Sequence, residues 1–301
     1  MPGSAAPVLK IGLIAPFEGL GRPLGYAILP AVQEAIAAAN SDMGPGGYRL
    51  LLVALNDDLD PEVAAAQAAA LAQDPAVIAV IGPFTTPTAA RVAPGLADAG
   101  IPTLVAAPLD LAPDGVFPLC PAPETIFREA DRAARGIYNA SCSEKVIDEG
   151  AIVCASGSGV ATLPEADVAT EPGHPAWAYW PGGAAEAADW LATDGGAAFV
   201  GALFGGPDLL KPWFVGRAGE MAEATRALAC SQGGPVRDDA TLPEVALARA
   251  GAERIIRAAA ANAQSGHPPT RAGVAAALSA QQFEPGLVWY EVSGGAWRRV
   301  E

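Results

Sequence analysis

The feature that most constrains this chain is a regular alternation of short apolar runs with longer segments of helical periodicity over its first third. The apolar runs are too short for helices and are bounded by turn or capping residues, which predicts strands. These predicted strands are 8–15 (VLKIGLIA), 48–55 (YRLLLVAL), 76–82 (AVIAVIG) and 101–107 (IPTLVAA). Strands that are apolar throughout and alternate with helices form a parallel sheet that is covered on both faces. The sequence therefore predicts an α/β fold.

The segments between these strands carry the start and stop signals of helices. Residues 24–39 hold apolar positions at helical spacing and end at Asn40, and residues 87–100 follow the third strand in the same way. A further helix begins after Asp60, which is the expected N-cap, with Pro61 at the first helical position. Each strand is thus followed by a helix, as in doubly wound folds.

Two adjacent threonines stand where the third strand ends and its helix starts, in the stretch VIGPFTTPTAARVAP at 80–94. Parallel sheets bind ligands beyond the carboxyl ends of their strands. We expect Thr86 to be the N-cap and Pro87 to lie in the first turn, so that the free amides of this turn and the hydroxyls of Thr85 and Thr86 could hold a carboxylate. The alternative is that both threonines only terminate and cap the two elements.

Composition excludes several classes of partner. The 301 residues, 51% of them hydrophobic, favour two domains. With 33 acidic and 18 basic residues the formal charge is -15, which repels nucleic acid and anionic membrane surfaces. No stretch approaches the roughly 20 uninterrupted apolar residues of a membrane-spanning helix. The start MPGSAAPVLK lacks the parts of a signal peptide, so we expect either a cytosolic chain or one whose export signal has been removed.

No residue pattern supports catalysis or a metal site. The two histidines, His174 and His267, lie in proline-rich stretches far apart in the sequence and without metal-ligand spacing. The SGSG at 156–159 lacks the flanks of a nucleophile elbow and of a dinucleotide fingerprint. The acidic cluster of Asp57, Asp58 and Asp60 lacks the spacing of a calcium loop. We expect a binding protein with no catalytic residue, cofactor or metal.

The order of the elements, followed by GVFPLCPAPETIFREADRAARGIYNA, resembles the type I periplasmic binding proteins, in particular their branched-chain amino acid group. IGLIAPFEGLGRPLG is similar to that family's first strand and glycine-containing loop, NDDLDPEVAAAQAAAL to its D-D-x-x-D-P helix start, and VIGPFTTPTAARVAPGLADAGIPTL to its ligand loop. From residue 250 the chain is similar to the family's late helix pair and closing β-hairpin. Few such pieces fall between about 140 and 235.

The resemblance implies two doubly wound parallel-sheet lobes with a hinge and an interlobe cleft, the second lobe being shortened. The first lobe would comprise 1–118 and 236–283, and the second 119–235 and 284–301. The function implied is that of a periplasmic or extracellular solute-binding protein, with or without a lipid anchor, whose partners are a small-molecule ligand and an ABC transporter permease. The alternative is a ligand-sensing domain of a receptor or regulator. A nucleotide-dependent α/β enzyme has little support from the residues.

The resemblance also suggests which residues would face the ligand. The first lobe would contribute residues that follow its strands, and the second lobe would contribute Ser156, Phe204 and Arg217. The first-lobe set is Phe17, Glu18, Thr85, Thr86, Ala107, Leu109 and Asp110. We also expect Trp177, Tyr179 and Trp180 either to form an aromatic wall or to cover the core of the second lobe.

Two features of amino-acid binders are missing from this pattern. Relatives carry a hydroxyl residue near the position of Leu109 and an acid near that of Ala218. A buried ammonium without a countercharge is costly, so a carboxylate or neutral polar ligand is favoured over a free amino acid, unless Glu18, Asp110 or Glu220 supplies the charge. Arg217 would then be available for an anionic group.

The four cysteines are compatible with an oxidising compartment and allow three complete pairings. Cys120 and Cys142 flank a predicted helix of about 17 residues, or roughly 25 Å of rise, so they should not pair with each other. Cys154 and Cys230 are expected either to meet in the second-lobe sheet or to remain buried thiols.

Overall fold

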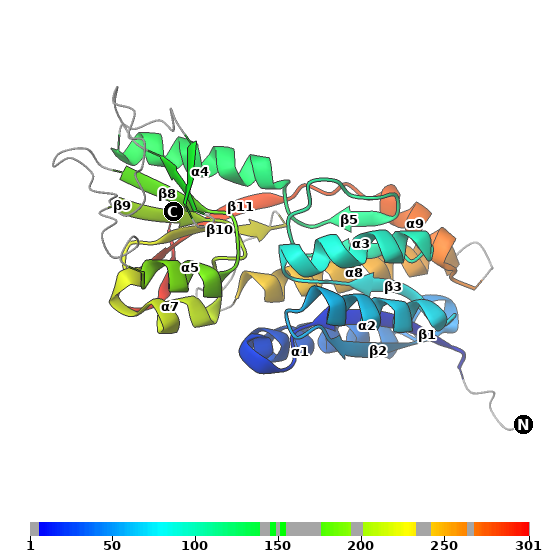
Figure 1. The fold of residues 1–301 in the computed structure, drawn as a ribbon. Coiled ribbons are helices and arrows are strands. Elements are labelled where there is room, and N and C mark those ends of the chain that lie inside the picture. Colours follow the sequence, from blue (N-terminus) through cyan, green and yellow to red (C-terminus); the bar gives the residue numbers. More distant parts are fainter. Residues whose placement is uncertain are drawn as a thin grey trace, which may run out of the picture. The chain divides into compact units, whose positions relative to one another are not determined.

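The chain forms two compact lobes that share the polypeptide in alternation (Figure 1). The computed structural model describes residues 6–138, 145–148, 151–154, 176–193, 201–232, 242–263 and 268–300. Lobe 1 is formed by residues 1–121 and 230–286, and lobe 2 by residues 122–229 and 287–301. The chain therefore passes from one lobe to the other three times, whereas the sequence places these passages at 118/119, 235/236 and 283/284.

Lobe 1 is built on a five-stranded sheet with the order β2-β1-β3-β4-β5. Every neighbouring pair in this sheet is parallel, as the uniformly apolar strands predict. The strands are β1 (Val8–Ala15), β2 (Arg49–Asn56), β3 (Val77–Ile81), β4 (Thr103–Val105) and β5 (Val116–Pro118). The chain winds in one direction from β1 to β2 and in the other from β3 to β5, so the direction reverses at β1 and β3.

Helices cover both faces of the lobe 1 sheet. They are α1 (Arg22–Ser41), α2 (Pro61–Gln73), α3 (Thr86–Asp98), α8 (Pro243–Ala263) and α9 (Arg271–Ser279). Val80 belongs to an apolar cluster with residues of α2 and α3, whereas the next side chain, Ile81, lies against Gly251 of α8. Because successive strand residues point to opposite faces, α2 and α3 lie on one face and α8 on the other (Figure 1).

The starts of two of these helices were predicted from capping residues. Asp60 caps α2, since its carboxylate accepts from the amides of Glu62 and Val63, which confirms the prediction. The start of α3 was predicted one residue too late: its N-cap is Thr85, and Thr86 is the first helical residue. Both threonines stand just before Pro87, so each of them satisfies the sequence rule.

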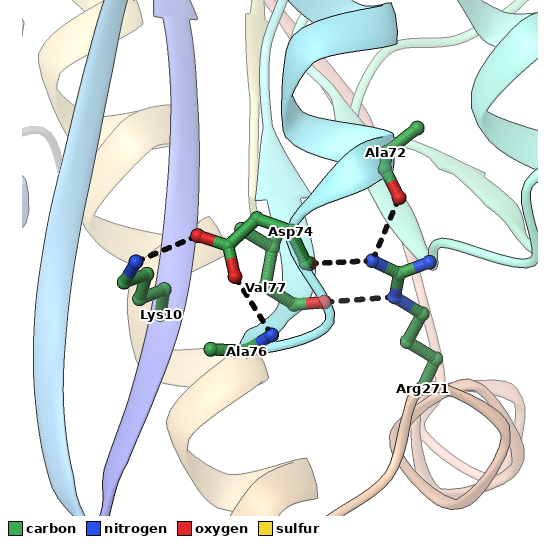
Figure 2. A network of polar contacts seen from close by, with 6 residues as sticks. All are labelled: Lys10, Ala72, Asp74, Ala76, Val77 and Arg271. Carbon is green, nitrogen blue, oxygen red and sulfur yellow. Dashed lines mark hydrogen bonds and ion pairs between the residues drawn. The ribbon is translucent and has the colours of Figure 1, made fainter.

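Arg271 lies at the edge of lobe 1 at which the strands begin, where it binds backbone carbonyl groups (Figure 2). Its guanidinium donates to the carbonyl oxygens of Val77 at 2.9 Å, Asp74 at 2.7 Å and Ala72 at 3.2 Å, and also to that of Ala99 at 3.3 Å. Ala72 and Asp74 lie at the end of α2 and Ala99 is the C-cap of α3, where the last carbonyls lack partners inside the helix. One cation thus ties the ends of α2 and α3 to the start of β3.

Lobe 2 is built on a mixed sheet with the order β12-β11-β10-β9-β8-β7-β6. The central strands β8, β9 and β10 are parallel, but β7 is antiparallel to both of its neighbours, β6 and β8, and β11 is antiparallel to β12. The strands are β6 (Lys145–Asp148), β7 (Ala151–Cys154), β8 (Ala176–Trp180), β9 (Gly201–Gly205), β10 (Arg226–Ser231), β11 (Gly286–Val292) and β12 (Trp297–Arg299). The expected all-parallel sheet is thus confined to the centre of this lobe.

The helices in the described part of lobe 2 are α4 (Pro123–Tyr138), α5 (Ala184–Leu191) and the short α7 (Pro212–Ala218), and α7 is followed by a 3-10 turn at Gly219–Ala222. The short α7 comprises seven residues. Among the described residues, no helix is both long enough and apolar enough to cross a bilayer.

The aromatic residues of β8 lie in the core of lobe 2 and do not form an exposed wall. Trp177 and Tyr179 pack in one apolar cluster together with Phe204, while Ala178 and Trp180 pack in a second cluster. The exposed fractions of Trp177, Tyr179 and Trp180 are 0%, 5% and 4%. Because this part of β8 is buried on both faces, each of the side chains from 177 to 180 contributes to a core.

A disulfide joins Cys120 to Cys230 across 110 residues of sequence, with the two Cα atoms 5.2 Å apart. The absence of a 120–142 bridge agrees with the position of α4, which spans Pro123–Tyr138 and separates the two cysteines. The alternatives for Cys230 were wrong, because this residue is neither bonded to Cys154 nor a thiol. Cys142 lies outside the described residues.

Candidate functional site

The carboxyl ends of β1 and β3 define the candidate site of lobe 1. These neighbouring strands are parallel and lie where the winding of the sheet reverses. In open α/β sheets the loops that leave such a point diverge and form a crevice that binds ligands. The loops concerned are 16–21 after β1 and 82–85 after β3, which carry Phe17, Glu18 and Thr85.

The start of α3 presents a hydroxyl pair at this edge. Thr85 Oγ1 lies 2.7 Å from Thr88 Oγ1, and the Thr88 hydroxyl also lies 3.0 Å from the Thr85 carbonyl oxygen, to which it can donate. Thr85 makes no side-chain cap to the helix, and the helical ladder begins when the Ala89 amide donates to the Thr85 carbonyl. The helical ladder thus starts only at Ala89, and this end of α3 carries a partial positive charge.

Thr88 was not singled out from the sequence, although it determines what the Thr85 hydroxyl can do. Its side chain is fully buried, with 0% exposed. A hydroxyl has one proton. When Thr88 donates to the Thr85 carbonyl, the Thr85 hydroxyl donates to Thr88 and only its lone pairs are left for other groups. When Thr88 donates to Thr85 Oγ1, the Thr85 proton becomes available to a ligand oxygen.

Close backbone approach at Gly82 brings the β3 loop to the end of β1. Gly82 has a φ of +89°, and a Cβ atom there would lie 2.2 Å from the carbonyl oxygen of Ile14. Only glycine fits this position, because other residues would clash with the backbone and rarely adopt such a φ. The Ala106 amide donates to the Pro83 carbonyl at 3.1 Å, which also ties the loop after β4 to this site.

Asn56 holds the loop that carries Phe17 and Glu18. Its Oδ1 atom accepts from the Phe17 amide at 2.7 Å and from the Asp58 amide at 3.1 Å. The Phe17 ring is half-buried and meets the Tyr26 ring edge-on at 6.0 Å between centroids, while Glu18 is exposed. Asn56 is the last residue of β2, and its role depends on the pairing of β1 with β2, so it was missed in the sequence.

Asp57 is a buried acid at the same edge. It is 1% exposed, and its Oδ1 atom accepts from the Leu59 amide at 3.1 Å. Burial, with a smaller contribution from the charge of Asp58, raises the pKa of Asp57 to about 6. The side chain therefore carries its charge at neutral pH at a cost to the stability of the fold, and it takes up a proton under mildly acidic conditions.

The residues that follow β4 divide into buried and exposed positions. Ala107 and Leu109 belong to an apolar cluster with residues of α3, and Leu109 is only 7% exposed. Asp110 is exposed. Leu109 therefore packs against α3, and Asp110, like Asp114 further along, offers a carboxylate to solvent.

The expected contacts from lobe 2 lie in different surroundings. Phe204 is fully buried, with its ring 5.5 Å from that of Trp177 and 5.9 Å from that of Trp289. Arg217 lies on the surface, where its guanidinium makes two 2.7 Å bonds to the carboxylate of Asp189 and lowers the pKa of that carboxyl. Ser156 lies outside the described residues.

Asp208 and Lys211 are buried charges that were missed in the sequence. They stand in the segment after β9, at the carboxyl edge of the parallel strands of lobe 2, with exposed fractions of 6% and 1%. Burial and the negative charge of Asp208 raise the pKa of the Tyr179 hydroxyl. A Cβ atom on Gly206 would lie 3.4 Å from that hydroxyl, which places Tyr179 at the same edge. The sequence PDLLK at 207–211 could have drawn attention to this pair, because it places one acid and one base of opposite charge on either side of two leucines.

Within the ranges that the structure describes, no group of three or more histidine, cysteine, aspartate or glutamate residues is placed to hold a metal ion.

Residues 8–131 match the periplasmic binding protein family. A comparison with curated protein sequences finds no match. The fold is similar to that of the branched-chain amino acid transporter substrate-binding protein LivJ from Streptococcus pneumoniae, solved in complex with isoleucine, with a TM-score of 0.71 and 16% identity over 97% of this chain and 99% of that one.

Two further solved structures have a fold similar to that of this chain. A leucine-binding protein, LivK, from Thermotoga maritima has a TM-score of 0.70 at 14% identity and covers 97% of this chain and 98% of its own. An ABC transporter substrate-binding protein from Desulfitobacterium hafniense, solved with leucine, has a TM-score of 0.65 at 16% identity and covers 97% of this chain and 100% of its own. The chain thus has the type I periplasmic binding protein fold, and the family that matches its first part consists of binding proteins, as predicted.

Proposed function

We propose that this protein is an extracellular or periplasmic solute-binding protein, whose two lobes enclose a small organic ligand and deliver it to the permease of an ABC transporter. The proposal rests on the family match of residues 8–131 and on the fold shared with transporter-associated binding proteins. No described residue cluster calls for a metal ion, and the acidic net charge of -15 disfavours nucleic acid as a partner.

The observation that carries the proposal is the arrangement at the start of α3. The Thr85 and Thr86 hydroxyls and the amides of the first turn lie where the winding of the lobe 1 sheet reverses, with Thr88 buried behind Thr85. Hydroxyls and helix amides favour a ligand oxygen with full or partial negative charge. We propose that this group binds a carboxylate or carbonyl oxygen of the ligand.

The ligand class follows from the charges around this group. We propose a carboxylate or a neutral polar compound rather than a free amino acid. The position of Leu109 offers no hydroxyl, and its side chain is buried. On the lobe 2 side the acid Asp208 shares its segment with Lys211, so the segment brings no net negative charge for an ammonium group. Glu18, Asp110 and Glu220 are exposed acids that could replace this charge.

A thermal-shift panel tests this proposal. Amino acids, aliphatic acids, aromatic acids and amides are each added to the purified protein, because a ligand that binds only the folded state raises Tm by mass action. We expect the largest shift from an acid or an amide, and the double variant Thr85→Val/Thr86→Val should lose this shift. The largest shift from leucine or another α-amino acid would refute the ligand class, and it should then disappear in Glu18→Gln or Asp110→Asn.

The transport role needs a separate measurement. Uptake of the identified ligand into proteoliposomes that hold the cognate permease should depend on this protein. Tight binding with no effect on uptake would favour the alternative function, a sensing domain of a receptor or regulator with the same fold.

A further inference from the structure

The three segments through which the chain leaves or enters lobe 1 are fastened to one another inside that lobe. The first ends with Leu119, Cys120 and Pro121, the second begins at Cys230, and the third ends at Gly286. All the contacts described below join residues that belong to lobe 1.

Two bonds join the first segment to the second. The Cys120–Cys230 disulfide is buried, with exposed fractions of 3% and 2% for the two residues. Two residues further along, Gln232 Nε2 donates to the Leu119 carbonyl at 2.9 Å. A covalent bond and a hydrogen bond therefore fix the spacing of these two segments, so neither can move away from the other.

Arg254 on α8 joins the second segment to the third. Its Nη2 donates to Gln232 Oε1 at 3.1 Å and its Nη1 donates to the Gln282 carbonyl at 3.0 Å. The guanidinium carbon lies 4.4 Å from the centroid of the Phe283 ring, which stacks on Phe117 at 5.5 Å. A guanidinium can donate hydrogen bonds to two acceptors in its own plane while its face packs against an aromatic ring.

The helix that carries Arg254 is itself tied to these segments. Gln281 Nε2 donates to the Arg254 carbonyl at 3.2 Å, and Gly251, one turn earlier, lies beside Leu119. The amide of Gln232 is satisfied at both ends, since its oxygen accepts from Arg254 and its nitrogen donates to Leu119. Polar networks in which each group has its partner tend to rigidify a structure.

We propose that Cys120, Cys230, Gln232, Arg254 and Phe283 form an anchor that holds the three connections at fixed spacing on lobe 1. Bending between the lobes is then confined to the few residues beyond the anchor, namely Pro121 and Ala122, Ala229, and Glu284 to Gly286. Hinge motions are absorbed by a few residues at the ends of elements, and they are rigid-body motions only if the chain on either side is held. The anchor supplies this condition on the lobe 1 side.

The anchor does not involve the ligand, so it can be tested whether or not the proposed function is correct. Spin labels are placed through non-natural amino acids at Ala69 on α2 and Glu186 on α5, both exposed, one in each lobe. Pulsed electron paramagnetic resonance of the ligand-free full chain then gives the distribution of distances between the lobes. The variant is Arg254→Met, which keeps an unbranched, flexible side chain and removes the guanidinium.

The matched control is Arg271→Met. This arginine also lies in lobe 1 and binds backbone carbonyls (Figure 2), but its partners lie at the edge where the strands begin and not in the three connections. We expect Arg254→Met to broaden the distance distribution, whereas Arg271→Met lowers Tm and leaves the width as in the wild type. Equal broadening in both variants would overturn the proposal, because it would indicate general loosening of lobe 1.

Two milder changes keep the test decisive if Arg254→Met does not fold. Gln232→Leu removes only the link between Arg254 and Leu119, and Cys120→Ser/Cys230→Ser removes only the covalent bond. Each should broaden the distribution, and the two combined should broaden it more than either alone. A width equal to that of the wild type in both variants would overturn the proposal.

Discussion

Thr88 Oγ1 lies 2.7 Å from Thr85 Oγ1, so a fully buried hydroxyl orients the side chain at the N-cap of α3. The Thr88 hydroxyl can donate either to Thr85 Oγ1 or to the Thr85 carbonyl, which lies 3.0 Å away. The choice decides whether the Thr85 hydroxyl offers a proton or a lone pair. A buried side chain with no direct access to solvent thus determines which ligand atoms this position can accept.

We predict that Thr88→Val weakens binding of the ligand identified by the thermal-shift panel. Valine has nearly the same shape, but it removes the hydroxyl that holds Thr85, and the loss of one hydrogen bond of this kind also costs about 1 kcal/mol of stability. Isothermal titration calorimetry and urea unfolding measure the two effects separately.

The control for this prediction is Thr88→Ser, which keeps the hydroxyl and loses a buried methyl group. Its stability should fall by a similar amount, about 1 kcal/mol. Its affinity should remain that of the wild type. Equal losses of affinity in the valine and serine variants would mean that Thr88 acts through packing alone.

Local chemistry made part of lobe 1 predictable from the sequence. Asp60 followed by Pro61 predicts the start of α2 because the cap is formed by residues two and three positions away. The same rule misplaced the start of α3 by one residue, because Thr85 and Thr86 are equally good caps before Pro87. Thr88 could have been recognised, since a third threonine one turn after Thr85 falls on the same side of the helix.

Contacts between distant segments could not be predicted in this way. The partners of Arg254 come from Gln232 and Gln282, 22 and 28 residues away, and none of them stands in a recognisable motif. Cys230 lies near the end of a strand of the lobe 2 sheet but belongs to lobe 1, so its partner follows from where the chain passes between lobes and not from its strand. In β8, burial of both faces leaves no polar alternation to show that Trp177 is a core residue.

We predict that Asp57→Asn stabilises the protein strongly at pH 7.5 and much less at pH 4.5. The pKa of Asp57 rises from 3.8 unfolded to about 6 folded, so the native state binds more protons in this window and its stability falls as the pH rises through it. A shift of this size corresponds to about 3 kcal/mol at neutral pH. Asparagine carries no charge, and its oxygen can still accept from the Leu59 amide.

Urea unfolding of both proteins at the two pH values checks this prediction. The exposed neighbour Asp58 supplies the control, because Asp58→Asn removes the same charge from a solvated position and should change stability little at either pH. A gain for Asp57→Asn that is as large at pH 4.5 as at pH 7.5 would show that its origin is not the ionisation of Asp57.

We predict that peptide mapping under non-reducing conditions finds Cys120 linked to Cys230. The 5.2 Å between their Cα atoms lies within the range that disulfides span. Because the bond closes a long loop, Cys120→Ser/Cys230→Ser should lower the free energy of unfolding by about 2–4 kcal/mol. Recovery of a peptide that joins Cys154 to Cys230 would contradict the structure of this region.

Finally, we predict that Arg217→Gln leaves the affinity for an acidic ligand unchanged. The guanidinium of Arg217 already makes two bonds to Asp189, which joins α7 to α5 on the surface, and this partner raises the pKa of Arg217. Both side chains are about half exposed, and solvent-exposed ion pairs of this kind add little to stability, so Tm should change only slightly.

Asp189→Asn is the matched variant, because it removes the partner of Arg217 and keeps the arginine itself. A gain in affinity for anionic ligands in this variant would show that Arg217 can reach the ligand once it is released. Calorimetry of both variants with the best acid from the panel decides the matter, and a marked loss of affinity in Arg217→Gln would mean that the arginine exchanges Asp189 for the ligand on binding.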